Sequence, residues 1–210
     1  MIRSPSLAAE LIAASKAGAS PLPVSVKTRV GFSTPGAEEW LGFLLAQGLA
    51  ALTVHGRSVA QQSGGKADWG LVSLAVKLRD LAGVSTRIVG NGDVGSAESF
   101  SRAARESGAD GIMIGRGIFR DLFVFQSIRG KASAPDTRPP AWFLRRHLDL
   151  HRETFGISPG LGLLKQIART YLAASPAWSG VLDALLHARS EGVFMAILAA
   201  REAGGSQAKR

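Results

Sequence analysis

The sequence predicts an α/β fold in which parallel strands alternate with helices, followed by a separate helical region. Four short apolar runs rich in β-branched residues predict buried strands, at 23–26, 50–54, 86–89 and 111–114. Longer segments with helical periodicity separate these runs, as parallel strands require. After residue 132 only helical patterns continue. Hydrophobic residues make up 46% of the 210 positions and charged residues 20%, which is typical of a folded globular chain.

Helix-start signals lie between the predicted strands. Each has a residue whose side-chain oxygen can cap a helix, with proline or an acidic residue as the typical first-turn signal: Ser4-Pro5, Thr34-Pro35 with Glu38 and Glu39, Asp68 before Trp69, and Ser96 before Ala97-Glu98. This repetition of strand and helix favours either a (β/α)8 barrel or a doubly wound sheet. Four strands alone cannot close a barrel of eight.

The C-terminal third predicts an all-helical domain. The turn-rich segment SAPDTRPP at 133–140 indicates a linker, and helices are expected at about 141–155, 160–174, 177–188 and 190–203. Their apolar faces are expected to form an ordinary bundle core from Trp142, Phe143, Leu148, Leu150, Phe155, Leu163, Ile167, Tyr171, Leu185, Phe194 and Ile197. The predicted organisation is therefore a strand-containing region at 1–130, a linker at 131–140 and a helical domain at 141–205.

Charge and composition narrow the classes of function. The net charge of +9 favours a polyanionic partner such as a nucleic acid, although a solvated basic surface without such a partner is the alternative. The absence of cysteine excludes disulfides and thiolate metal sites, and among the four histidines only His147 and His151 lie close in sequence, so no metal site is expected. No apolar run is long enough for a membrane span and no signal peptide is recognisable, which predicts a cytoplasmic protein.

Polar residues stand at the ends of all four predicted strands. Lys27, His55, Asn91 with Asp93, and Arg116 follow the successive apolar runs. A single such residue is more often a lysine extended to solvent or a histidine bonded to a backbone carbonyl. Four of them at equivalent positions favour a shared site, because the carboxyl ends of parallel strands meet at one face of a barrel.

Two glycine-containing stretches suggest the kind of ligand. GNGD at 90–93 and GRG at 115–117 let backbone N–H groups approach an anion closely, which predicts a phosphate site, although GRG is also common as a simple strand-to-helix turn. In barrels a phosphate pocket often follows the seventh and eighth strands. The four strands would then be numbers five to eight of a barrel.

Five motifs in order resemble those of the tRNA-dihydrouridine synthase family: PVSVKTRVGF at 23–32, LTVHGRS at 52–58, QQSGGKADW at 61–69, VGNGDV at 89–94 and GADGIMIGRGIF at 108–119. The resemblance covers residues 1–130 strongly and the helical tail more weakly. It implies the C-terminal half of a (β/α)8 TIM barrel, strands five to eight, followed by a small all-helical domain that holds tRNA.

The resemblance also implies roles for individual residues. The residues expected to bind the cofactor FMN are Lys27, His55, Asn91, Gly92, Asp93, Gly115 and Arg116. The residues expected to contact tRNA are Arg57 and, on the predicted helices, Arg145, Arg146, Arg152, Lys165 and Arg169. In the family, NADPH or NADH reduces FMN, the flavin passes hydride to a uridine, and a cysteine on a mobile loop donates the proton.

The sequence departs from the family pattern in one respect. The segments for strands one to four, including the Asn-Gly-Cys-Pro stretch, are not found, and no residue of this chain matches the catalytic cysteine. Three explanations are open: a truncated product of a normal enzyme, a half that pairs with another chain, or a unit that dimerises to complete a barrel. The expected function is tRNA-dihydrouridine synthase, inactive as this chain alone. The alternatives are a non-catalytic FMN- or tRNA-binding remnant and, more distantly, an FMN barrel enzyme acting on a small molecule.

Overall fold

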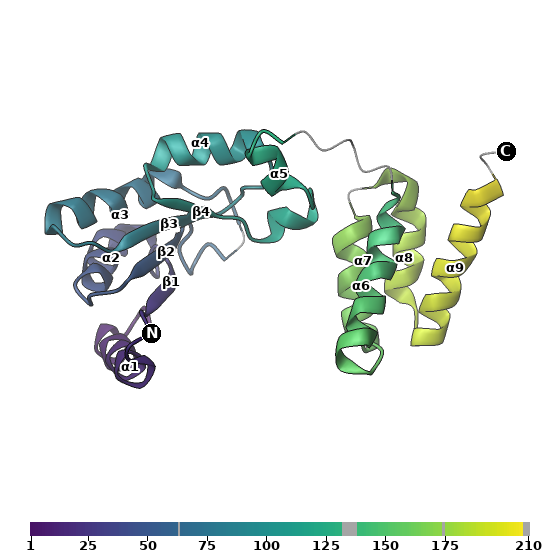
Figure 1. Ribbon diagram of the computed structural model, residues 1–210, viewed down its shortest axis with the longest axis horizontal. Helices are drawn as coiled ribbons and strands as arrows, with labels where there is room; N and C mark the ends of the chain where they lie inside the picture. The colour runs from purple at the N-terminus through teal and green to yellow at the C-terminus, as the bar shows by residue number, and fades with distance from the viewer. Residues whose placement is uncertain (63, 132–137, 174, 208–210) are drawn as a thin grey trace. The chain divides into compact units, whose positions relative to one another are not determined.

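The computed structural model describes residues 1–62, 64–131, 138–173 and 175–207, with side chains described as far as Arg201. The chain forms two compact units, Met1–Ala132 and Ser133–Arg210, coloured purple to green and green to yellow in Figure 1. Most of the predicted linker at 131–140 lies outside the described residues. Within the described part of the chain, no helix is both long and apolar enough to cross a membrane.

A four-stranded parallel sheet forms the centre of the first unit. Its strands lie in chain order: β1 Ser25–Arg29, β2 Ala51–His55, β3 Arg87–Asn91 and β4 Gly111–Met113. The helices of this unit are α1 Pro5–Ala19, α2 Ala37–Leu45, α3 Trp69–Ala82, α4 Ala97–Ser107 and α5 Val124–Ile128. The predicted alternation of parallel strands and helices is confirmed, and the arrangement is consistent with a partial barrel.

The first strand lies two to three residues later than predicted. The apolar run at 23–26 predicted its end at Val26, but backbone pairing with β2 continues until Arg29 lies opposite His55. Lys27 is therefore inside the strand and not after it. Pairing to a neighbouring strand sets this boundary, and a short apolar run does not reveal it.

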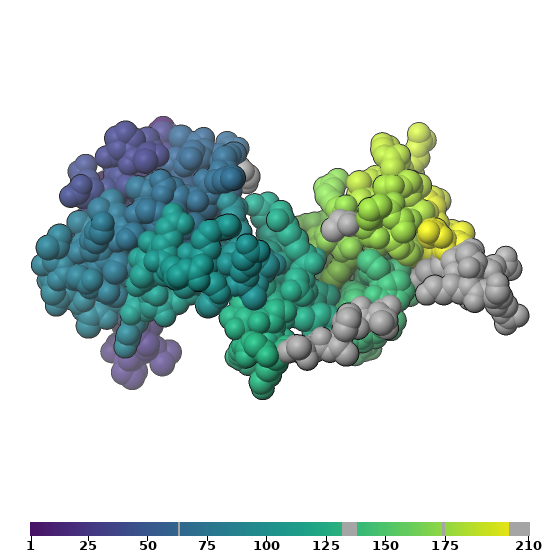
Figure 2. Space-filling view, turned by 90° about the horizontal axis from the view of Figure 1, so that it is seen from above, coloured from purple at the N-terminus to yellow at the C-terminus, as the bar shows by residue number. Residues whose placement is uncertain are grey.

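Helices α2, α3 and α4 follow one another along the sheet, each in contact with the next (Figure 1). Their apolar sides pack on strand residues such as Leu52, Val54 and Ile88, which are fully buried. The outer surfaces of α3 and α4, blue and teal, lie side by side in Figure 2. Helices thus cover one face of the sheet. Strand side chains that point to the opposite face are not part of this core.

Local sequence explains where these helices begin and end. The Asp68 side chain accepts a hydrogen bond from the Gly70 N–H at 2.9 Å, and Ser96 forms a capping box with Ser99. Both caps were predicted. The Thr34-Pro35 signal starts a short 3-10 turn that leads into α2. Gly83 ends α3 in the left-handed conformation that glycine adopts without strain.

The described residues of the second unit form four α-helices. They are α6 Pro140–Phe155, α7 Leu161–Leu172, α8 Ser179–His187 and α9 Glu191–Gln207. The expected helical region is confirmed, and Leu148, Ile167, Leu185 and Phe194 are buried as predicted.

The predicted bundle core includes several residues that are exposed in the structure. Trp142 is 40% exposed and Phe155 64% exposed, and Leu150 and Leu163 are similarly accessible. A helical period shows which apolar positions of α6 share a side, but it does not show which of them a neighbouring helix covers.

Candidate functional site

Two rows of side chains cross the sheet on the face opposite the helices. The strand register aligns Arg29, His55, Asn91 and Met113, and two residues earlier it aligns Lys27, Thr53, Val89 and Gly111. Residues aligned in register across parallel strands point to the same face. Thr28 faces the other way, because its hydroxyl accepts a hydrogen bond from the indole of Trp40 on α2. Lys27, His55 and Asn91 are therefore brought together as the sequence predicted.

A cavity of about 1400 Å³ lies at the carboxyl end of the strands. Its lining includes all seven residues expected to bind the cofactor: Lys27, His55, Asn91, Gly92, Asp93, Gly115 and Arg116. The loops that follow β3 and β4 lie close together, since a methyl group at Gly95 would be 3.3 Å from the Cα of Gly117. The Asn91 amide also donates to the Met113 carbonyl at 2.9 Å, which joins the ends of these strands.

The turn at Gly92 and Asp93 has an unusual backbone. Gly92 has φ 134° and Asp93 has φ 55°, a left-handed value that is uncommon for a residue with a side chain. The Asp93 carboxylate accepts hydrogen bonds from the Ala67 N–H at 2.7 Å and from Arg57 at 2.7 and 2.8 Å. These bonds tie the turn after β3 to the loop after β2, which holds the strained turn in place.

Arg57, which was expected to contact tRNA, is buried beside the cavity. It is 5% exposed, and its guanidinium donates to Asp93 and to the Gly65 carbonyl. The sequence could not reveal this because the ion-pair partner lies 36 positions away. The structure thus places Arg57 inside the wall of the cavity.

The charges of the site favour a neutral histidine. Burial lowers the pKa of His55 from 6.5 to about 4, and the positive charges of Arg29, Lys27 and Arg57 act in the same direction, while Asp93 opposes them. Burial and the neighbouring Arg29 likewise lower the pKa of Lys27. For Asp93, burial raises the pKa, but the hydrogen bonds from Ala67 and Arg57 outweigh it and the net shift is downward.

Several basic residues of the cavity were not anticipated. Arg29, Lys66, Arg102 and Arg120 also line it. Arg29 was detectable in principle, because it stands two residues after Lys27 and so shares its face of the strand. Its guanidinium donates to the carbonyls of Ser58 and Gln62 at 2.8 and 2.6 Å, which fastens the loop after β2. Arg102 and Arg120 lie on α4 and after β4, where no motif marked them.

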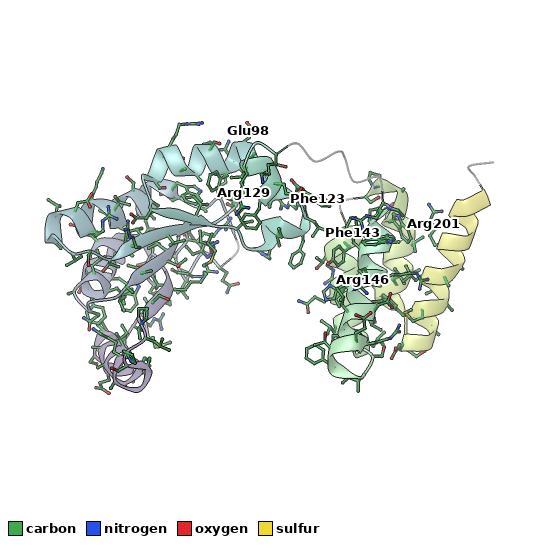
Figure 3. The ribbon with its side chains drawn as sticks, in the orientation of Figure 1. Glu98, Phe123, Arg129, Phe143, Arg146 and Arg201 are labelled. Atoms are coloured by element: carbon green, nitrogen blue, oxygen red, sulfur yellow. The ribbon has the colours of Figure 1, made fainter. Side chains whose placement is uncertain are left out.

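The arginines and lysine expected to contact RNA in the second unit lie on two helices. Arg145, Arg146 and Arg152 are on α6, and Lys165 and Arg169 are on α7. Arg146, labelled in Figure 3, projects from α6 and pairs with Glu153 at 3.0 Å between exposed side chains. Arg152 lies 3.7 Å from Asp149 and 3.9 Å from Glu191. Exposed pairs of this kind are weak enough to exchange for a phosphate.

A second cavity, of about 450 Å³, lies on the same unit. Aromatic and basic side chains of α6, with Tyr171 of α7, line it, including Trp142, Phe143, Arg146, His147 and Phe155. The His147 ring and the Tyr171 hydroxyl are 3.2 Å apart. The exposed aromatic residues that were predicted to be core therefore form part of a hollow.

Comparison with known proteins identifies the family. The profile of the dihydrouridine synthase family matches residues 1–179, which include the whole sheet and both glycine-containing turns. The chain belongs to the dihydrouridine synthase family, a group of FMN-dependent oxidoreductases.

Several curated bacterial proteins resemble the chain. "Probable tRNA-dihydrouridine synthase 2" of Bacillus subtilis is 42% identical over 154 residues, covering 73% of this chain and 46% of the relative. A "Probable tRNA-dihydrouridine synthase" of Staphylococcus epidermidis is 38% identical over 151 residues, covering 71% and 45%. One of Staphylococcus aureus is 39% identical over 127 residues, covering 60% and 38%. The chain thus spans less than half the length of these relatives.

Proposed function

We propose that the chain provides the FMN-phosphate and tRNA-binding part of a tRNA-dihydrouridine synthase, with its strands as numbers five to eight of a TIM barrel. The reaction would be reduction of a uridine in tRNA to 5,6-dihydrouridine with NADPH or NADH. One observation carries the proposal: the strand register gathers Lys27, His55 and Asn91 beside the turns at Gly92 and Gly115 in a single cavity. That convergence at the carboxyl edge is where barrels bind ligands.

The residues of the two turns fit a phosphate. A methyl group at Gly115 would find no atom closer than the Asn91 amide at 3.9 Å, so the backbone there is open to a ligand. Arg116 follows directly and is exposed, so its guanidinium can reach an anion. Arg102 and Arg120 add positive charge to the same lining. A phosphate bound here would meet both backbone donors and guanidinium groups.

The strand residues fit a flavin ring. FMN, when bound, would supply the hydride chemistry that no side chain provides. Lys27 would place a positive charge beside the ring, where it favours the negatively charged reduced form. Neutral His55 would offer a hydrogen bond without adding a second cation. Asn91, held by its bond to the Met113 carbonyl, would face the ligand from β3.

The helical unit is the proposed tRNA-binding domain, at 141–205. Arg145, Arg146, Lys165 and Arg169 lie on α6 and α7, where positive side chains could meet phosphates of the RNA. A uridine must leave its stack to reach a flavin, so tRNA would have to contact both units. A tRNA substrate would place the protein in the cytoplasm.

Reduction of uridine needs a proton donor that this chain does not supply. The family uses a cysteine, and the 210 residues contain none. The sheet order also leaves β1 and β4 as edge strands among the described residues. We therefore expect the chain to be inactive alone, and an active enzyme to need the remaining strands of the barrel, supplied by a longer form of the same protein, by another chain or by a second copy.

A second candidate is a non-catalytic FMN- or tRNA-binding remnant, with which the lack of cysteine in these 210 residues is consistent. The two functions differ in what the coding DNA upstream of Met1 contains. An in-frame continuation that encodes an Asn-Gly-Cys-Pro stretch would favour the enzyme. Its absence, together with retained FMN binding, would favour the remnant.

The phosphate site is tested by comparing FMN with riboflavin, which lacks the phosphate, in fluorescence titrations of the full chain. Removing a charge-assisted hydrogen bond costs about 1.5–3 kcal/mol, so Arg116→Ala should weaken FMN binding by roughly 10- to 100-fold and leave riboflavin binding unchanged. Arg105→Ala is the matched control, because Arg105 is exposed on α4 and is not part of the cavity lining. The proposed site would be contradicted if Arg116→Ala lowered the affinity for FMN and for riboflavin equally, or if the wild type bound FMN no more tightly than riboflavin.

A further inference from the structure

Arg57 has almost all of its donors engaged inside the protein. Its Nη2 donates to both carboxylate oxygens of Asp93 at 2.8 and 2.7 Å and to the Gly65 carbonyl at 2.7 Å, and its Nε donates to the same carbonyl at 3.3 Å. Asp93 in turn accepts the Ala67 N–H. Removing the Asp93 carboxylate would be costly because the buried Arg57 guanidinium would lose its partner. Arg57 is therefore a fixed part of the wall.

The remaining terminal nitrogen of Arg57 meets His55. Its Nη1 lies 3.3 Å from the Nε2 of the imidazole. A guanidinium can only donate hydrogen bonds and does not lose its proton in proteins, so His55 must accept through Nε2. A neutral imidazole that accepts through Nε2 carries its proton on Nδ1. The geometry of Arg57 thus selects one of the two tautomers of His55.

The packing of the ring shows which edge is left for a ligand. A methyl group at Gly92 would lie 3.2 Å from Cδ2 and 3.5 Å from Nε2 of His55. The Cδ2–Nε2 edge is therefore occupied by Gly92 and Arg57. His55 lines the large cavity, and no hydrogen bond to Nδ1 is present among the residues that the structure describes. The Nδ1 edge is the one available to a bound molecule.

The charge state of His55 supports a neutral ring at neutral pH. Burial lowers its pKa to about 4, helped by Arg29 and Lys27 of β1 and by Arg57, while Asp93 raises it. The charged groups facing the ring from both neighbouring strands and from the loop after β2 are therefore mainly positive. A second proton on the imidazole would also break its bond to Arg57, since Nε2 would no longer accept.

We propose that Arg57 is a positioning residue that fixes His55 as the Nδ1–H tautomer, so that His55 donates a hydrogen bond to an acceptor atom of the ligand in the cavity. Asp93 and Gly65 hold Arg57 in the orientation that this requires. The donor role toward a ligand rests on the proposed function, whereas the tautomer is a property of the chain alone.

Long-range ¹H–¹⁵N NMR of the labelled full chain reports the tautomer directly. The His55 signals are those that disappear in His55→Gln. The wild type should show Nδ1 protonated and Nε2 unprotonated between pH 5.5 and 8, with a preference of at least about tenfold, as expected for a hydrogen bond to a charged donor. A proton on Nε2 in the wild type would overturn the proposal without any variant.

Two variants separate the hydrogen bond from the charge. Arg57→Met should collapse the preference to a mixture of tautomers. Lys27→Met also removes a nearby positive charge, but no hydrogen bond between Lys27 and His55 is present, so it should raise the His55 pKa and leave the tautomer unchanged. Loss of the preference in Lys27→Met, or its persistence in Arg57→Met, would overturn the proposal.

Addition of FMN then tests the donor role separately. The Nδ1-bound proton should shift on binding. If FMN does not bind while the tautomer is as expected, the proposed function fails and the role of Arg57 stands. If FMN binds and the Nδ1 proton does not respond, the donor role is overturned.

Discussion

Replacing Gly92 with alanine should damage the site through the backbone and through packing together. Gly92 has φ 134°, a conformation that residues with side chains rarely adopt. The new methyl group would lie 2.5 Å from the Cβ of Ala67 and 3.2 Å from Cδ2 of His55. Carbon atoms pack best at about 3.5–4.0 Å, so the loop after β2 must move by roughly 1 Å.

The free-energy cost can be estimated from these two effects. A residue held in a sparsely populated backbone region costs about 1–3 kcal/mol, and an added methyl group in a packed site costs a similar amount. Because the loop is partly exposed and can relax, we expect a total of about 3 kcal/mol. At about 1.4 kcal/mol per factor of ten, this corresponds to roughly 100-fold faster amide exchange in β2 and β3 if they open with the loop.

Hydrogen exchange followed by mass spectrometry measures this effect for each segment. Peptides from α6 and α7 serve as an internal reference, because they belong to the other compact unit. Gly18→Ala on α1 is the matched control: no atom lies within 4 Å of the added methyl group, and alanine favours the helix. If Gly92→Ala exchanged no faster than wild type around β2 and β3, the close packing of His55, Ala67 and Gly92 would be refuted.

Three further predictions concern charge. Asp93→Asn should weaken the hold on the buried Arg57 by about 2 kcal/mol and speed proteolysis of the loop after β2; an unchanged rate would show that the pair does not hold the loop. The folded-state pKa of His55, about 4, lies below the unfolded value of 6.5, so its contribution to stability is present above pH 6.5 and declines as pH falls toward 4; a midpoint near 6.5 by NMR would contradict this. Lys165→Ala should lower tRNA affinity and reduce the salt slope by about one, while Lys77→Ala on α3 should not; equal effects would argue against binding by α7.

Much of the site could be predicted because parallel strands convert sequence order into spatial order. His55 and Asn91 end equivalent apolar runs, and the register places them side by side. Their convergence required no knowledge of long-range contacts, only that consecutive strands are neighbours. Lys27 was also placed at the cavity, although its strand extends further than the apolar run indicated.

The features that the sequence did not reveal depend on contacts between residues that are far apart in the sequence. The burial of Arg57 follows from its ion pair with Asp93, and an arginine after a strand gives no sign of such a partner. The exposure of Trp142 and Phe155 depends on how far α7 covers α6, which a helical period does not determine. Local sequence patterns predict which face of a helix or strand is apolar and where the element ends. Which residues contact each other across the structure depends on the complete fold.

The most direct test of the central claim is the visible absorbance of the purified full chain after FMN has been added and unbound flavin removed, with circular dichroism to verify folding. The account predicts about one flavin per chain, because the strand-end residues and the two glycine-containing turns of the cavity belong to this chain. A folded chain that retains no flavin would contradict the claim that these residues form a cofactor site.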